Sequence, residues 1–121
     1  MLIDDDPDSI KIISYFLKKM GFTKIICADN GMSAMQQLGK HHTDLIISDC
    51  VMPGMTGVEL FNAIKANDKF KNIPFLLMTA NTEKEHVLEA SKAGITHRIV
   101  KPLDFDTLKT KFNEMSVGHK S

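Results

Sequence analysis

The sequence of 121 residues predicts an α/β protein in which five helices pack on a doubly wound, five-stranded parallel sheet. Short apolar runs, of the kind that forms buried strands, alternate with segments whose apolar residues recur at helical spacing. The loops between these segments are short. Such crossover connections are right-handed and place helices on both faces of the sheet.

The first strand is expected at residues 2–3, and the helix after it begins at Pro7 with Asp6 as its N-cap. Gly21 ends this helix. The apolar residues of the helix share one face: Ile10, Ile13, Leu17 and Met20. This face should pack on the sheet.

Residues 24–28 are expected to form the second strand and residues 44–49 the third. Between them, Asn30 and Gly31 open a helix. Its inward residues are Ala34, Met35 and Leu38. The apolar run that leads to Asp49 is continuous, which indicates a strand covered on both faces.

The second half of the chain begins with a loop at residues 51–57 and then continues the alternation. The expected segments are a helix over about residues 58–67, a strand over 74–78, a helix over 83–93, a strand over 98–100 and a helix over 104–115. The last helix has an apolar face formed by Phe105, Leu108, Phe112 and Met115. Residues 1–116 should form one domain, followed by a short tail at 117–121.

Composition limits the possible functions. The 15 basic and 15 acidic residues give a formal charge of zero, so no basic face indicates a nucleic-acid-binding protein. No apolar stretch approaches membrane-spanning length, and no signal pattern is present, so we expect a cytoplasmic protein without membrane contact. Cys27 and Cys50 are expected to be buried thiols in a reducing compartment. His86, His97 and His119 are expected at the surface.

Charged residues follow three of the apolar runs. Asp4, Asp5 and Asp6 follow the first strand, Asp49 ends the third, and Lys101 follows the fifth. In a parallel sheet these strand ends share one rim, where ligands bind. Carboxylates gathered there would need a hard cation, an ammonium group or protons to offset their repulsion. The pattern therefore predicts a magnesium site beside a nucleophilic aspartate.

Five segments of the chain, in this order, resemble the signature of the response-regulator receiver domain: residues 2–7, 47–55, 77–80, 93–94 and 101–102. The layout is most similar to the single-domain regulators of bacterial chemotaxis. The resemblance implies a flavodoxin-like fold and phosphorelay signalling. Asp49 would accept a phosphoryl group from the phosphohistidine of a sensor histidine kinase or a histidine phosphotransfer protein.

The resemblance also implies a set of magnesium ligands. Asp5, Asp49 and the backbone carbonyl of Val51 would bind Mg²⁺ directly, and Asp4 would bind it through a water. Asp6 would be a helix cap. Because Mg²⁺ prefers about six oxygen ligands and usually keeps several waters, a partial protein shell of this kind is appropriate.

Three further residues carry implied roles in signalling. Lys101 would pair with Asp49 at rest and with the phosphoryl group afterwards, and the Thr79 hydroxyl would then bond a phosphoryl oxygen and start a two-state shift. Pro102 would follow a cis peptide bond that aims Lys101. Arg98 stands where the family commonly has an aromatic residue that moves inward on activation, so we expect Arg98 to meet a partner or an acidic neighbour instead.

The output face would comprise the fourth helix, the fifth strand and the fifth helix, over residues 83–115. It would regulate an unknown output protein, and the protein would catalyse only its own phosphorylation and dephosphorylation. Val51 and Asn81 occupy the two variable positions beside the site. An apolar Val51 cannot orient an attacking water, so we expect slow self-dephosphorylation. The chain could be a stand-alone regulator or part of a longer one.

Two other classes of protein use related features. A magnesium-dependent phosphohydrolase with an aspartate nucleophile would share the ion and the covalent intermediate, but it typically needs a second acid at the position of Val51. A flavodoxin-like electron carrier that binds FMN would share the fold, but its first loop should be rich in glycine and hydroxyl groups rather than acidic.

Overall fold

The computed structural model describes residues 1–80 and 84–115. The predicted tail at residues 117–121, Asn81, His119 and the expected helix start at residue 83 lie outside the described part. Within it, all five expected strands and all five expected helices are present in the expected order.

The five strands form one sheet in the order β2-β1-β3-β4-β5, and every neighbouring pair is parallel. The strands are β1 (Leu2–Ile3), β2 (Cys27–Ala28), β3 (Ile46–Asp49), β4 (Phe75–Thr79) and β5 (Arg98–Val100). β3 and β4 are buried along their whole length, as the continuous apolar run before Asp49 indicates. The order reverses at β1, so the carboxyl ends of β1 and β3 flank the switch point where ligands bind in such sheets.

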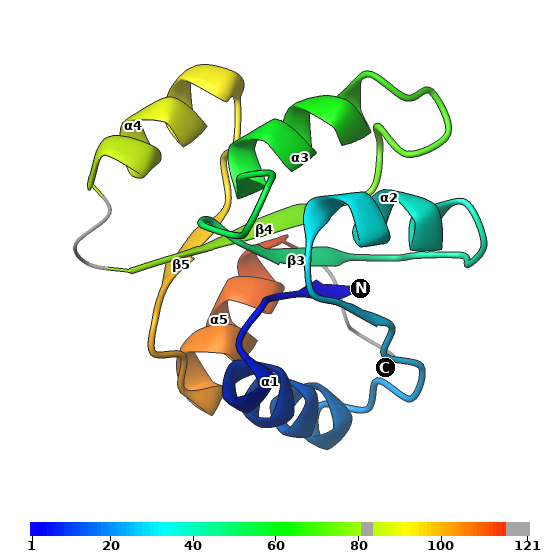
Figure 1. Ribbon diagram of the computed structural model, residues 1–121. Helices are drawn as coiled ribbons and strands as arrows, with labels where there is room; N and C mark the ends of the chain where they lie inside the picture. Colours follow the sequence, from blue (N-terminus) through cyan, green and yellow to red (C-terminus); the bar gives the residue numbers. More distant parts are fainter. Residues whose placement is uncertain (81–83, 116–121) are drawn as a thin grey trace.

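The helices cover both faces of the sheet (Figure 1). They are α1 (Pro7–Lys19), α2 (Gly31–Leu38), α3 (Gly57–Lys65), α4 (Lys84–Ala93) and α5 (Phe105–Met115). α2, α3 and α4 lie on one face, and α1 and α5 lie on the other. None of these helices, over the described residues, has the length and apolar character needed to cross a bilayer.

Alternating side chains along the strands divide the core into two layers. Ile3 and Leu77 point to the side of α2, α3 and α4, whereas Leu2, Leu76 and Ile99 point to the side of α1 and α5. The second layer contains most of the predicted inward residues of α1 and α5: Ile13, Leu17, Leu108 and Phe112 are buried, and Ile10, Met20 and Met115 pack against them. Phe105, also predicted on this face, is half-buried and packs edge-on against Phe16 instead. Helical periodicity therefore predicted both packing faces.

Local signals fix where the helices begin. Asp6 caps α1 through a bond from the Asp8 N–H, and Asn30 caps α2. Thr56 and Glu59 form a capping box at the start of α3, in which each side chain accepts a bond from the other residue's backbone N–H. The Thr-x-x-Glu spacing that signals this box is present in the sequence, although the helix was expected to begin one residue later.

Two predictions about the β2 edge are wrong. β2 includes only Cys27–Ala28 rather than residues 24–28, and β3 begins at Ile46 rather than at residue 44. β2 pairs only with β1, which contributes two residues to the ladder, so residues 24–26 lack a strand partner. β3 pairs with β4 from Ile46 onward, where β4 begins at Phe75. Cys27 is exposed, not buried, whereas Cys50 is buried as expected.

Candidate functional site

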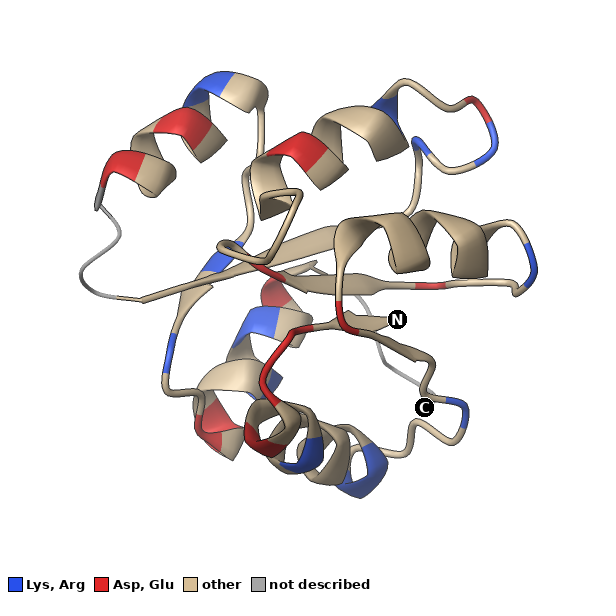
Figure 2. Ribbon diagram, in the orientation of Figure 1, with Lys and Arg blue, Asp and Glu red and all other residues tan. Residues whose placement is uncertain are grey.

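The sheet brings its predicted site residues to one rim. Asp4 and Asp5 follow β1, Asp49 ends β3, Thr79 ends β4, and Lys101 follows β5. In Figure 2 the ribbon after β1 and the end of β3 are both coloured as acidic. The parallel register explains this convergence, because all five strands end on the same side.

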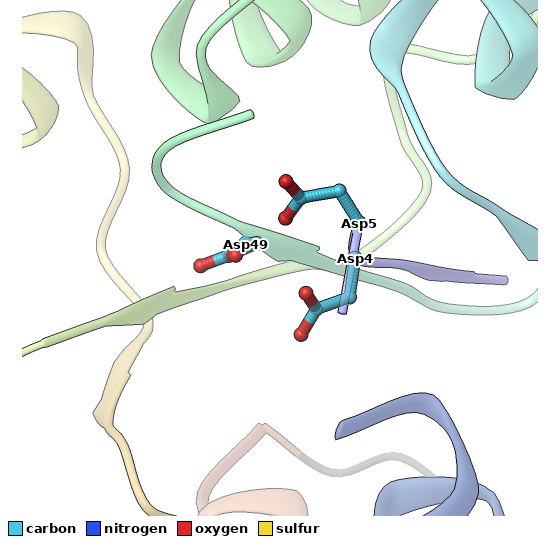
Figure 3. A group of neighbouring side chains, drawn as sticks. All are labelled: Asp4, Asp5 and Asp49. Atoms are coloured by element: carbon cyan, nitrogen blue, oxygen red, sulfur yellow. The ribbon is translucent and has the colours of Figure 1, made fainter. Parts of the chain in front are cut away.

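Three carboxylates from two of these strand ends form a cluster (Figure 3). Asp4, Asp5 and Asp49 each offer one oxygen, and these oxygens lie within 4.8 Å of one another. Asp4 and Asp49 are buried, whereas Asp5 is exposed, so the cluster opens to solvent on one side. Hard oxygen donors with access to water match the preference of Mg²⁺ for carboxylates together with retained waters. The donor set therefore fits the predicted ion.

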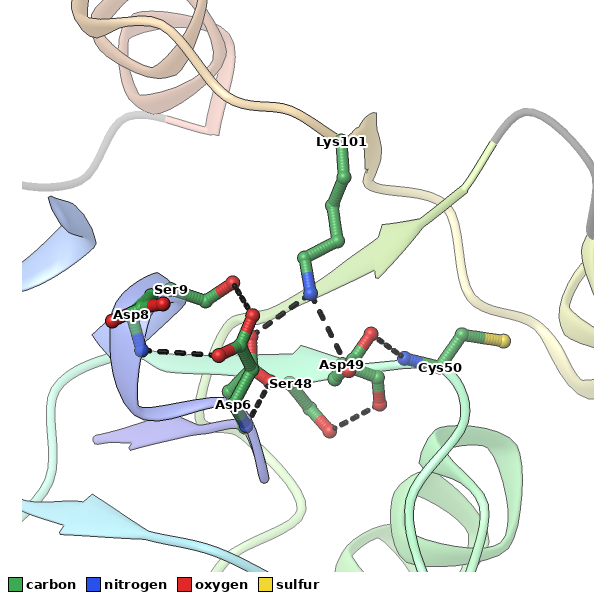
Figure 4. Close-up of polar contacts among 8 residues, drawn as sticks. Asp6, Asp8, Ser9, Ser48, Asp49, Cys50 and Lys101 are labelled. Carbon is green, nitrogen blue, oxygen red and sulfur yellow. Dashed lines mark hydrogen bonds and ion pairs between the residues drawn. The ribbon is translucent and has the colours of Figure 1, made fainter. Parts of the chain in front are cut away.

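Lys101 reaches into the same cluster (Figure 4). Its Nζ donates to Asp4 Oδ2 at 2.9 Å and lies 3.4 Å from Asp49 Oδ2. Lys101 was expected to pair with Asp49 at rest. It contacts both Asp49 and Asp4, and the shorter contact is to Asp4. One ammonium group offsets two buried carboxylates, which leaves the cluster with a net negative charge.

The Asp49 carboxylate is held where ionisation is unfavourable. Its Oδ1 accepts a 2.9 Å bond from the Cys50 N–H, and its backbone carbonyl accepts one from the Ser48 hydroxyl. Burial raises the pKa of Asp49 to about 6, and the charge of Asp4 adds to this effect. Lys101 and the Cys50 N–H lower the pKa, but they do not outweigh the other two causes.

The Lys101 ammonium is stabilised in its charged form. Burial alone would lower its pKa, but the hydrogen bond to Asp4 and the charges of Asp49 and Asp4 outweigh burial and raise the pKa. Lys101 therefore stays charged at neutral pH and provides a fixed cation at the rim.

Asp6, the third acid of the run that follows β1, has a different role. Asp6 Oδ1 accepts from the Asp8 N–H at 3.0 Å and Oδ2 accepts from the Ser9 hydroxyl at 3.2 Å (Figure 4). The Asp6 N–H in turn donates to Asp4 Oδ1 at 3.0 Å. Asp6 is thus the helix cap that the sequence predicted, and its backbone also orients Asp4.

Thr79, Pro102 and Val51 lie around the cluster. Thr79 is buried, and its carbonyl accepts a 2.7 Å bond from the Lys101 N–H. The Lys101–Pro102 peptide bond is cis, which confirms that expectation. Val51 follows Asp49 by two residues and its side chain is 44% exposed. A ligand role for its backbone carbonyl stays a prediction.

The Arg98 side chain contacts α4 rather than an acidic residue. Its Nη1 donates to the Ser91 hydroxyl at 2.8 Å and to the Val87 carbonyl at 3.3 Å, both in α4. Within the described residues no acidic side chain pairs with Arg98, so that half of the expectation is wrong, whereas a contact between Arg98 and a partner protein stays a prediction. The sequence contained no signal for these contacts, because they depend on where α4 packs relative to β5.

Gly57 supports the site, although no sequence motif assigned it a role. A Cβ at this position would lie 2.5 Å from the Asp49 carbonyl oxygen and 2.7 Å from Leu77 Cδ1. The Gly57 N–H donates to the Cys50 carbonyl at 2.7 Å. Glycine thus lets the start of α3 approach the end of β3 and fix the Asp49 backbone. The glycine after Thr56 was visible, but only the packed structure shows this close approach.

Comparison with known proteins gives consistent matches. Residues 1–113 match the family of response regulator receiver domains. The chain is 34% identical over 115 residues to the chemotaxis protein CheY of Pseudomonas aeruginosa, covering 95% of this chain and 93% of that protein.

Among solved structures, the receiver domain of a signal transduction histidine kinase from Syntrophus aciditrophicus has a TM-score of 0.86 and 28% identity, covering 98% of this chain and 90% of the other. The chemotaxis response regulator CheY4 of Vibrio cholerae has a TM-score of 0.84 and 31% identity, covering 93% of each chain. These neighbours confirm the flavodoxin-like fold.

Proposed function

The chain belongs to the family of response regulator receiver domains, and from this premise we propose that it is a phosphorelay receiver whose Asp49 accepts a phosphoryl group. The family consists of signalling proteins of two-component systems. The observation that carries the proposal is the environment of Asp49: a buried carboxylate beside two further carboxylates and one fixed ammonium group.

The reaction is a transfer between a phosphohistidine and Asp49. One Asp49 oxygen attacks phosphorus, a P–O bond forms, and the P–N bond to the donor imidazole breaks. The bonding electrons remain on the imidazole nitrogen, which takes up a proton. Such a transfer depends mainly on positioning and on neutralisation of charge. The Cys50 N–H fixes one Asp49 oxygen at 2.9 Å, which limits rotation of the nucleophile.

Asp4, Asp5 and Asp49, with the Val51 carbonyl, would hold magnesium. Bound there, Mg²⁺ would offset the carboxylate repulsion and the negative charge on the phosphoryl oxygens. The resting contacts of the Lys101 ammonium to Asp4 and Asp49 leave it within reach of a group attached to Asp49. It would therefore pair with the phosphoryl group after transfer.

Thr79 would connect the phosphoryl group to the output face. It ends β4, and its hydroxyl would bond a phosphoryl oxygen, which would bias the arrangement of α4, β5 and α5. This change would regulate a partner protein. The donor would be a sensor histidine kinase or a histidine phosphotransfer protein, and the domain would span residues 1–116. Two free cysteines support a reducing compartment such as the cytoplasm.

Neither alternative function gains support from the site. The loop after β1 presents acidic side chains to the rim, where an FMN phosphate would be repelled. Val51, with its apolar side chain, occupies the position where a phosphohydrolase would carry a second acid. The receiver function assigns a role to every charged group in the cluster and needs no second acid at Val51.

The proposal is tested by intact mass after incubation with magnesium and acetyl phosphate. The native chain should gain a single phosphoryl group, and an Asp49→Ala variant should gain none. Asp29→Ala is a matched control, since Asp29 is an exposed acid at the same rim. Equal addition to the native chain and to Asp49→Ala would refute Asp49 as the acceptor.

A further inference from the structure

Arg98 connects the edge strand of the sheet to α4. Its side chain lies on the same face as α4, because Ile99, the next residue, packs on the opposite face with α5. The guanidinium Nη1 donates to the Val87 carbonyl and to the Ser91 hydroxyl of α4. Both bonds have a charged donor, and such hydrogen bonds are stronger than those between neutral groups.

The described residues of α4 bury little apolar surface. Of its described side chains, Ala90 alone is fully buried, and alanine contributes little apolar area. Leu88 is 62% exposed. α4 also lies at the end of the layer formed by α2, α3 and α4, so only α3 flanks it (Figure 1). Ala93 packs at the edge of the core beside Ala90, so the apolar contact of α4 is small and the two Arg98 bonds add to it.

The resting position of α4 also leaves one buried polar atom without a hydrogen bond, which is energetically unfavourable. His86 was expected at the surface, but it is half-buried, and its Nδ1 is buried without a hydrogen-bond partner among the described residues. A buried polar atom left without a partner favours any arrangement in which it regains one. α4 is thus both weakly packed and locally unsatisfied.

The same strand leads from Arg98 to the phosphoacceptor site. Val100 pairs with Thr79 in the β4–β5 ladder, and the Lys101 N–H donates to the Thr79 carbonyl. The Lys101 ammonium contacts Asp4 and Asp49. α4 begins at Lys84, five residues after Thr79. Thr79 therefore lies beside β5 in the sheet, and Arg98 joins β5 to α4.

We propose that Arg98 is a positioning residue whose bonds to Val87 and Ser91 hold α4 in the resting arrangement, and that phosphorylation of Asp49 releases them. We call this pair of bonds the α4 latch. Its signalling role rests on the function proposed above. Its resting role does not, because the contacts exist in the unphosphorylated protein.

Hydrogen exchange of α4 backbone amides, read by mass spectrometry, tests the latch. In the unphosphorylated protein, Arg98→Ala should speed exchange in α4 by about tenfold, because local opening no longer breaks two charged bonds. Ser91→Ala should have a smaller effect, and Arg98→Lys should restore part of the protection. Lys92→Ala is the matched control: it removes a positive charge from the exposed side of α4 and should leave exchange unchanged.

Addition of magnesium and acetyl phosphate should bring α4 of the native protein close to the exchange of Arg98→Ala, and should change that variant little. Equal resting exchange in α4 of Arg98→Ala and the native protein would overturn the latch, as would acceleration spread evenly over all helices. A phosphorylated native protein with unchanged α4 exchange would overturn its release. Intact mass of the same samples shows separately whether phosphorylation itself failed.

Discussion

At the scale of single residues, groups with opposing effects surround Asp49. Burial and the charge of Asp4 raise its pKa to about 6 from 3.8, while Lys101 lowers it. The folded protein therefore binds a proton at Asp49 more tightly than the unfolded chain does. A group of this kind stabilises the fold below the unfolded pKa, and its contribution is lost as the pH rises through the folded value. At neutral pH the ionised Asp49 destabilises the apoprotein.

The raised pKa of Asp49 leads to a prediction for Asp49→Asn in magnesium-free buffer. The free energy of unfolding should rise by about 1 to 3 kcal/mol at about pH 8, because the neutral amide avoids the cost of the buried charge. The gain should shrink as the pH falls towards about 4, where Asp49 of the native protein is protonated. Urea unfolding at several pH values measures this.

Asp68→Asn is the control for this comparison. The Asp68 side chain is 95% exposed, and its ion pair is with Lys71, three residues later in the loop after α3. Its removal should change stability by less than about 0.5 kcal/mol at any pH. If Asp49→Asn is less stable than the native protein above pH 7, the attraction between Lys101 and the Asp49 charge outweighs the cost of burying that charge.

Val51 carries a prediction about the lifetime of the phosphoryl group. Its exposed, apolar side chain cannot orient water towards an acyl phosphate. Val51→Asn should therefore speed loss of the phosphoryl group by about tenfold, since an amide can position the attacking water. Intact mass followed over time measures the rate. Met32→Asn, on the exposed face of α2, should leave it unchanged. A native lifetime of only seconds would contradict the expected slow dephosphorylation.

At the scale of elements, the start of α3 depends on Gly57. A methyl group there would lie 2.5 Å from the Asp49 carbonyl oxygen, so α3 or β3 would have to move. We expect Gly57→Ala to destabilise the protein by about 1 to 3 kcal/mol and to weaken phosphorylation, because it displaces the Asp49 backbone. Gly39→Ala is the control: there the nearest atom would lie 3.5 Å away and φ is −71°.

Urea unfolding and intact mass distinguish the outcomes for Gly57. If both glycine variants behave like the native protein, the close approach of α3 to β3 has no energetic consequence. If Gly57→Ala loses stability but still accepts a phosphoryl group at the native rate, Gly57 supports the fold and not the position of Asp49.

The elements also show how far sequence reasoning reaches. Helical periodicity predicted the buried faces of α1 and α5, and capping residues predicted where α1 and α2 begin. The length of β2 was not predictable from residues 24–28, because a strand needs a neighbour, and β1 supplies only two residues. No local sequence pattern predicts contacts between distant elements, such as those of Arg98 with α4.

At the scale of the whole molecule, the parallel sheet is what makes the site. It brings Asp4, Asp5, Asp49, Thr79 and Lys101 from four strand ends to one rim, which the alternation of strands and helices predicted. The sequence did not predict how Lys101 divides its contacts between Asp4 and Asp49, because that depends on distances of tenths of an ångström.

Magnesium should stabilise the whole fold through this rim. An ion that binds only the folded protein raises the free energy of unfolding by mass action, by about 2.7 kcal/mol at a hundredfold excess over Kd. Asp5→Asn should abolish most of this gain and leave the apoprotein nearly unchanged, because Asp5 is exposed. Urea unfolding with magnesium and with a chelator measures both. A full magnesium response in Asp5→Asn would exclude Asp5 as a ligand.

The most direct test of the account is to locate the phosphoryl group by chemical trapping. Phosphoramidate, which carries the same P–N bond as a phosphohistidine, would be supplied with magnesium, and borohydride would then reduce the aspartyl phosphate to homoserine. Peptide mass spectrometry should find homoserine at position 49 alone, and none when magnesium is chelated. Homoserine at another acid, or none at all in a protein that binds magnesium, would contradict the assignment of Asp49 as the phosphoacceptor.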